Sequence, residues 1–110
     1  DAMDGARLTE AHNVAIGLDA MGAVDEGQND GAGTQASDEN IAIGYNALLG
    51  GDMGDNNDST NRYFNGNVAI GNLALDANTT ASHNIAIGPS AMTANTTGNQ
   101  NVAIGGRVKV

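Results

Sequence analysis

The sequence predicts an all-β fold, a parallel β-roll (β-solenoid) of short coils stacked on one another. The first reason is a motif, Asn-[Val/Ile]-Ala-Ile-Gly, that occurs five times in 110 residues. The copies start at Asn13, Asn40, Asn67, Asn84 and Asn101, so their spacings are 27, 27, 17 and 17 residues. A period of 17 is too short for a pair of helices. The second reason is composition, since one Phe, two Tyr and no Trp cannot build a conventional globular core.

Each copy of the motif predicts a short strand followed by a corner. Val or Ile, then Ala, then Ile favours a strand, and the Gly that follows permits a positive φ at a tight turn. Asn tolerates the left-handed region and bonds locally to backbone, and stacked Asn side chains are expected to form a ladder. The structural residues of the repeat are Asn13-Val14-Ala15-Ile16-Gly17, Asn40-Ile41-Ala42-Ile43-Gly44, Asn67-Val68-Ala69-Ile70-Gly71, Asn84-Ile85-Ala86-Ile87-Gly88 and Asn101-Val102-Ala103-Ile104-Gly105.

A second apolar element follows the first four copies after two further residues. It is an Ala with a long apolar neighbour, in the pairs Ala20-Met21, Ala47-Leu48, Ala74-Leu75 and Ala91-Met92. We expect each pair to begin a second short strand, so that one coil holds two strands and two turns. The 27-residue coils differ from the 17-residue coils by ten residues. These insertions fall within about 22–39 and 49–66, and residues 1–110 form one repeat domain, expected to be a segment of a longer fibre.

Both faces of each predicted strand are apolar, which is typical of a strand that is covered on both sides. In Val14-Ala15-Ile16, Val and Ile point one way and Ala the other. A thin roll covers only one face by itself, and the simplest cover for the other is a second copy of the chain. We therefore expect a homo-oligomer with Val and Ile inward and the Ala row at the interface. The reverse assignment of the two faces stays open.

The charge balance excludes several classes of partner. Four basic residues stand against thirteen acidic ones, for a net charge of −9. Nucleic-acid binding needs Lys and Arg, and no apolar run is long enough for membrane insertion. Cys is absent, which excludes disulfides and thiolate metal sites. No spacing suggests a nucleophile with its base, so we expect no enzyme, no catalytic residues and no cofactor.

The repeat resembles the head repeats of YadA-like trimeric autotransporter adhesins, and phage fibre proteins that carry the same motif. The segments Ile43-Gly44-Tyr45-Asn46-Ala47-Leu48 and Asn95-Thr96-Thr97-Gly98-Asn99-Gln100-Asn101 carry the likeness, which covers about residues 11–105. The resemblance implies a left-handed parallel β-roll, a homotrimer and a role in surface attachment. The coils here are longer than those of the adhesin heads, which favours a fibre module.

These expectations combine into a functional hypothesis. The chain is expected to be a structural or adhesive module of an extracellular trimeric fibre, a phage or viral tail or head fibre that contacts the host surface. One alternative is the head of a bacterial trimeric autotransporter adhesin. Another is a self-polymerising extracellular filament or surface-layer subunit. The partners are then other copies of the chain and a host-cell glycan or protein receptor, at a virion or bacterial surface.

The insertions hold the candidate binding residues, because function tends to lie in loops on a regular scaffold. Their acidic residues are weak Ca²⁺ candidates, with solvated loops as the alternative; they are Asp25, Asp30, Asp52, Asp55 and Asp58. Arg62, Tyr63 and Phe64 form a candidate recognition group for a sugar or protein, although the aromatic pair equally fits a role in pinning the loop. His12 and His83 both precede a motif Asn, and are either simple turn positions or, in a trimer, rings of three that hold an anion or metal.

Overall fold

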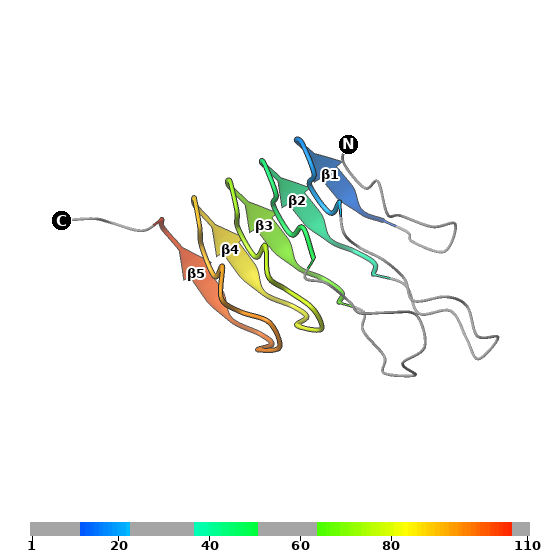
Figure 1. Ribbon diagram of the computed structural model, residues 1–110. Helices are drawn as coiled ribbons and strands as arrows, with labels where there is room; N and C mark the ends of the chain where they lie inside the picture. The colour runs from blue at the N-terminus through cyan, green and yellow to red at the C-terminus, as the bar shows by residue number, and fades with distance from the viewer. Residues whose placement is uncertain (1–11, 23–36, 51–63, 107–110) are drawn as a thin grey trace.

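The repeat forms a single five-stranded parallel sheet with the strands in chain order (Figure 1). The computed structural model describes residues 12–22, 37–50 and 64–106. Each strand is the three-residue centre of one motif copy, and no helix occurs in the described ranges. The strands are β1 (Val14–Ile16), β2 (Ile41–Ile43), β3 (Val68–Ile70), β4 (Ile85–Ile87) and β5 (Val102–Ile104). The predicted all-β class is thus confirmed, with the strands at the predicted positions.

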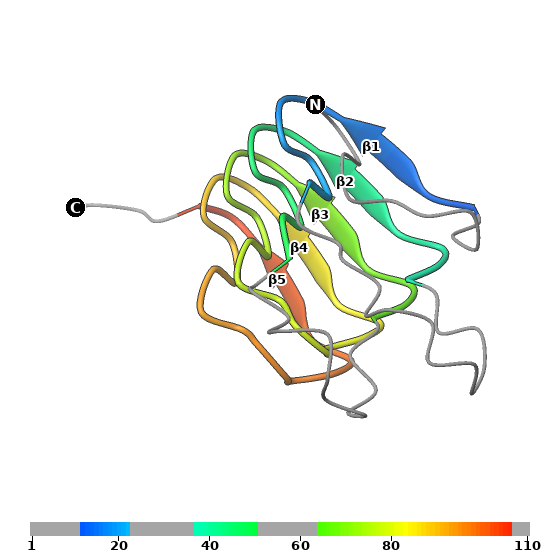
Figure 2. The same cartoon turned by 45° about the vertical axis from the view of Figure 1, so that its right-hand side comes forward.

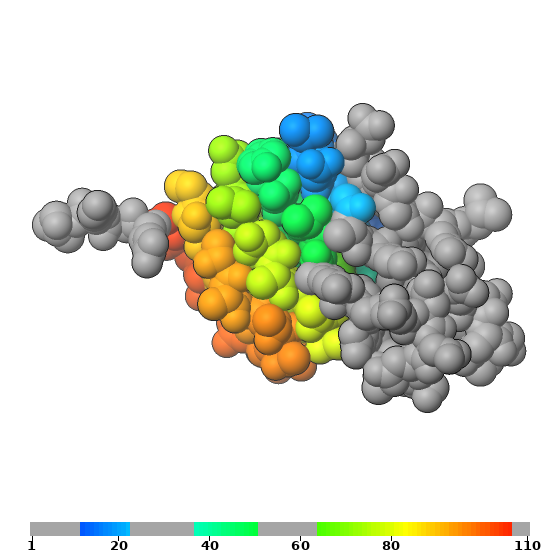
Figure 3. Space-filling model, in the orientation of Figure 1, coloured from blue at the N-terminus to red at the C-terminus, as the bar shows by residue number. Residues whose placement is uncertain are grey.

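The register between neighbouring strands does not depend on the length of the segment that joins them. Val14 pairs with Ile41 across a 27-residue repeat, and Val68 pairs with Ile85 across a 17-residue repeat. In both cases the Ala residues pair with Ala and the last Ile with Ile. Figure 3 shows the described repeats as successive bands in chain order, from blue to red. The ten-residue insertions therefore leave the sheet unchanged.

The corner after each strand requires Gly, as predicted. The five motif Gly residues have φ between 120° and 132°, which L side chains rarely adopt. They also stack on one another: a Cβ on Gly71 would lie 2.6 Å from the carbonyl carbon of Gly88. Both backbone conformation and close approach between repeats thus exclude a side chain at this position.

The predicted second strand is wrong. The Ala-[Met/Leu] pairs form a turn, in which Met21, Leu48, Leu75 and Met92 have φ between 48° and 55°. This left-handed conformation is costly for a bulky residue. It is held by hydrogen bonds between repeats, such as Leu48 N–H to the Ala74 carbonyl at 2.8 Å. In the described parts of the repeats, the backbone that follows each of the first four strands turns and lies beside that of a neighbouring repeat (Figure 2).

The expected assignment of the strand faces is also reversed. The Ala residues of the central strands, Ala42, Ala69 and Ala86, are fully buried, whereas Ile16 is 57 % and Ile104 is 73 % exposed. The core lies between the Ala row and the turns. It consists of Ala20, Met21, Ala42, Ala47, Leu48, Phe64, Ala69, Ala74, Leu75, Ala86 and Ala91. Short Ala side chains on the strands leave room for the long Met and Leu side chains of the turns, so the β-branched residues face outward.

Candidate functional site

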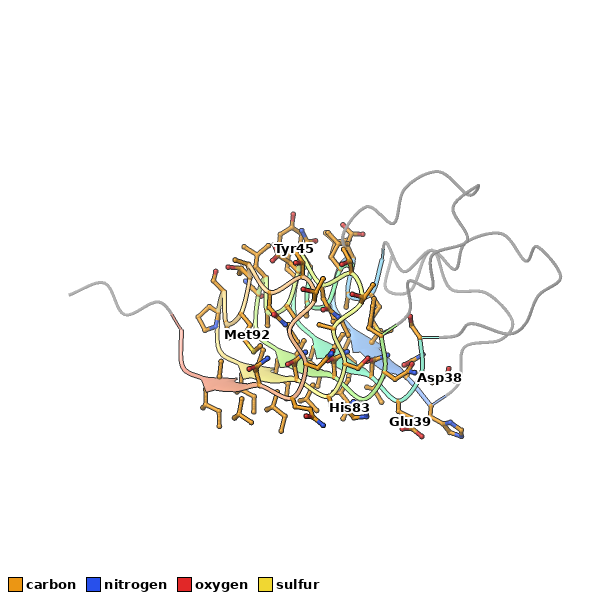
Figure 4. The ribbon with its side chains drawn as sticks, turned by 90° about the horizontal axis from the view of Figure 1, so that it is seen from below. Asp38, Glu39, Tyr45, His83 and Met92 are labelled. Atoms are coloured by element: carbon orange, nitrogen blue, oxygen red, sulfur yellow. The ribbon has the colours of Figure 1, made fainter. Side chains whose placement is uncertain are left out.

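The main candidate site is the sheet face that the fold leaves open. Two β-branched side chains from each strand line it, and they range from half-buried in the middle to exposed at both ends. We call this the open face. Its residues are Val14, Ile16, Ile41, Ile43, Val68, Ile70, Ile85, Ile87, Val102 and Ile104. Figure 4 shows side chains projecting from the strands on the side away from Tyr45, with Met92 between the strands and the turns. A contiguous apolar face of this kind is a candidate interaction surface.

A ladder of Asn side chains links the strands of the open face at the residue before each strand. The Oδ1 atom of Asn13 accepts the backbone N–H of Asn40 at 2.9 Å, and Asn40 accepts that of Asn67 at 3.0 Å. The pattern continues through Asn84 to Asn101, again at 3.0 and 2.9 Å. The predicted Asn ladder is therefore confirmed.

The side-chain amides complete the ladder. The Nδ2 atom of Asn67 donates to Oδ1 of Asn40 at 3.2 Å and to the carbonyl of Ala81 at 3.0 Å. Asn84 repeats this with Asn67 and the carbonyl of Gly98. The three buried residues of the ladder, Asn40, Asn67 and Asn84, thus use both side-chain donors and accept two hydrogen bonds each, which compensates for burial of the amide.

A column of variable residues borders the open face. The residue before each motif Asn adopts the left-handed conformation, with φ between 59° and 65°. The column consists of His12, Glu39, Gly66, His83 and Gln100. Figure 4 places Glu39 and His83 at the strand side of the molecule. Sequence reasoning noted the two His residues and missed the column. The sequence does contain evidence for the column, because the residue type changes at this position while the motif that follows it stays the same.

His12 and His83 do not meet within one chain. Two repeats separate their strands, β1 and β4, and both side chains are exposed. The His83 ring lies over Gly66, since a Cβ on Gly66 would be 3.0 Å from His83 Cδ2. Across residues 12–22, 37–50 and 64–106, no three His, Asp or Glu side chains gather in a group that fits a metal ion.

The predicted sites in the insertions are only partly within the described ranges. The five acidic candidates, Asp25, Asp30, Asp52, Asp55 and Asp58, lie outside them, as do Arg62 and Tyr63. Phe64 is fully buried in the core. Its ring is unavailable to a surface ligand, which removes Phe64 from the recognition group and favours its alternative role of pinning the insertion to the sheet.

Comparison with protein-family models, curated proteins and solved structures returned no match. Within the part of the chain that the structure describes, no helix has the length and apolarity needed to cross a membrane.

Proposed function

We propose that the chain is a structural and adhesive module of an extracellular trimeric fibre, in which three left-handed β-rolls pack their open faces around a common axis. The observation that carries this proposal is the open face itself. In the monomer, the two β-branched side chains of each strand are only partly covered, and those of β1 and β5 are exposed. The same residues at every repeat would give a continuous apolar seam along the fibre.

The energy available from this face is large enough to drive association. Complete burial of a Val or Ile side chain contributes about 1.5–3 kcal/mol. If half of that is realised because the residues are already partly covered, ten of them contribute about 7–15 kcal/mol per chain. Association costs about 4–15 kcal/mol, so the open face offsets that cost.

The shape of the face favours three copies. Each strand is only three residues long, which corresponds to a face about 10 Å wide. Three such narrow faces enclose a triangular apolar core, in which each chain contacts both others. The resemblance to trimeric fibres supports the same number.

The fibre would present its insertions to a host receptor, a glycan or a protein. A regular scaffold that carries two unlike ten-residue insertions suits this role. A net charge of −9 per chain keeps such a rod soluble and away from nucleic acid. The location would be a virion surface, or a bacterial surface if the chain is instead the head of a trimeric adhesin. The proposed role is non-enzymatic.

The test is the mass in solution by light scattering, comparing the parent chain with two variants of equal charge. Ile70→Asp places a carboxylate in the middle of the open face, whereas Thr97→Asp places it on an exposed loop residue. We expect the parent and Thr97→Asp to be trimers of about three times 11.0 kDa, and Ile70→Asp to be a folded monomer. A monomeric parent chain, or a trimer that Ile70→Asp leaves intact, would contradict the proposal.

The same measurement in EDTA tests the calcium hypothesis. We expect the trimer to persist, because the residues of the open face need no metal to associate. Dissociation in EDTA that Ca²⁺ reverses would instead assign a structural ion to the acidic insertions.

A further inference from the structure

Each junction between repeats joins two different edges. Toward the following repeat, a strand offers the N–H of its first residue and the carbonyl of its third. Val14 N–H donates to the carbonyl of Asn40 at 2.8 Å, and the carbonyl of Ile16 accepts the N–H of Gly44 at 2.8 Å. The Oδ1 atom of the motif Asn completes this edge.

The same set of groups recurs on the outer edge of β5. These groups are the N–H of Val102, the carbonyl of Ile104 and Oδ1 of Asn101, and none of them bonds to a residue in the described ranges. Gly105 has the φ of the other motif Gly residues, 120°. In the four preceding copies a Cβ would meet the next Gly backbone at 2.6–2.8 Å, but at Gly105 nothing lies within 4 Å. Among the described residues, none pairs with or covers this edge, which carries the groups that a further repeat would bind.

The outer edge of β1 carries the complementary set. In the later repeats, the backbone N–H of the motif Asn, its Nδ2 atom and the N–H of the motif Gly all donate toward the preceding repeat, while the Asn carbonyl accepts from it. In the first repeat these groups belong to Asn13 and Gly17, and no described repeat precedes that one. The two outer edges are thus the two halves of a junction that the chain already makes four times.

We infer that the outer edge of β5 is a docking site for the β1 edge of a second copy of this chain. Val14 of one copy would pair with Val102 of the other, as Val14 pairs with Ile41 inside the chain. Unpaired strand edges of this kind add strands readily. The contact is head to tail and does not close on itself, so it extends the stack in a line. This head-to-tail contact uses the edge of the sheet, whereas the proposed trimer uses its open face, so the two contacts are independent.

Cysteine pairing tests the contact, because the chain has no Cys of its own. V14C and V102C variants are mixed in equal amounts and oxidised under mild conditions. Neighbouring positions in a sheet are within the Cα separation that a disulfide spans, about 4.4–6.8 Å. Head-to-tail docking predicts V14C–V102C heterodimers well above random pairing, and a double V14C/V102C variant that forms ladders of more than three chains.

Other assemblies give different products. A parallel trimer through the open face brings equal positions together and yields V14C–V14C and V102C–V102C homodimers. An antiparallel face-to-face pair yields heterodimers, but the double variant then closes into a dimer. Heterodimers at or below random pairing, or a double variant whose products stop at three chains, would overturn the inference without touching the proposed trimer.

A second pair of variants tests the hydrogen bonds of the edge. V102P removes the outward N–H and places a ring at the edge, whereas V102T changes the same side chain and keeps the N–H. Sedimentation velocity over a range of protein concentrations, in salt that screens the repulsion between acidic chains, measures the association. We expect V102P to weaken end-to-end association at least about tenfold relative to V102T. Equal association of the two variants would refute the docking site.

Discussion

The side-chain oxygen of Asn67 accepts two hydrogen bonds from Asn84, one from the backbone N–H at 3.0 Å and one from Nδ2 at 3.3 Å. Both residues are fully buried. A single atom thus satisfies two donors of the next repeat, 17 residues along the chain. The same bond occurs across 27 residues between Asn40 and Asn67. The ladder, rather than the length of the connecting segment, fixes how one repeat sits on another.

Replacing Asn67 by Leu should therefore lower the free energy of unfolding strongly. The change leaves the backbone N–H and one side-chain N–H of Asn84 without partners in a buried site, at about 1–3 kcal/mol for each group. It also removes one of the two hydrogen bonds to Oδ1 of Asn40, which keeps the bond from the backbone N–H of residue 67. We expect a loss of about 3 kcal/mol or more in urea denaturation at fixed protein concentration. Asn101→Leu is the matched control, since Asn101 is exposed and accepts from no described residue; its loss should be about 1 kcal/mol. Equal losses would show that the ladder does not stabilise the stack.

The motif Gly residues allow backbone strain to be separated from close approach. Gly71 and Gly105 have φ of 128° and 120°, so Ala is strained to a similar degree at both. Only at Gly71 does the added Cβ meet a neighbouring backbone, at 2.6 Å. We expect Gly71→Ala to unfold with a free energy at least about 2 kcal/mol lower than Gly105→Ala. The comparison is made by urea denaturation at a low protein concentration, where the β5 edge is free. A difference below about 0.5 kcal/mol would contradict the stacked-Gly geometry.

Leu75 tests the position of the core. Its side chain is fully buried between the Ala row and the neighbouring turns, whereas Leu18 is 59 % exposed. Leu75→Ala should cost about 2–5 kcal/mol because it leaves a cavity. Leu18→Ala should change the free energy of unfolding by about 0.5 kcal/mol or less. If Leu18 proved the more costly site, the assignment of inner and outer faces would be wrong.

The second insertion can be removed as a unit. Deleting residues 51–60 shortens the spacing between Asn40 and Asn67 from 27 to 17 and brings Asn61 to the place that Asn78 has in the next repeat. We expect the free energy of unfolding to stay within about 1 kcal/mol of the parent, because a shorter loop costs less to close. Loss of receptor binding by this variant, with its trimer mass intact, would place recognition in the insertion. A variant that fails to fold would show that the insertion is part of the core.

The sequence predicted those features that depend on one residue type at a fixed position. The strands follow from Val-Ala-Ile, the corner from the Gly at its end, and the ladder from the Asn at its start. It could not tell which face of Val68-Ala69-Ile70 is buried, because both faces are apolar. That choice depends on the long side chains of the turns, such as Leu75, which is buried in the same cluster as Ala69 and Ala86.

The turn at Leu48 was beyond local prediction for a different reason. A Leu with φ of 48° costs about 1–2 kcal/mol by itself, so intrinsic preference argues against it. The conformation is stabilised by the hydrogen bond to the Ala74 carbonyl of another repeat. For the candidate site, the sequence predicted that one apolar face of the strands is left for a partner. It assigned the Ala row to that face, whereas the structure leaves Val and Ile there.

The unequal spacing of the repeats also has a consequence for how the chain folds. Closing a 27-residue segment costs about 0.4 kcal/mol more conformational entropy than closing a 17-residue segment, for the same set of hydrogen bonds on docking. We therefore expect pairing of β3, β4 and β5 to form the folding nucleus, and the stack to grow from it toward β1. Each added repeat contacts only its neighbour. The entropic cost of adding a repeat therefore depends on the length of its own connecting segment and not on how many repeats the stack already contains.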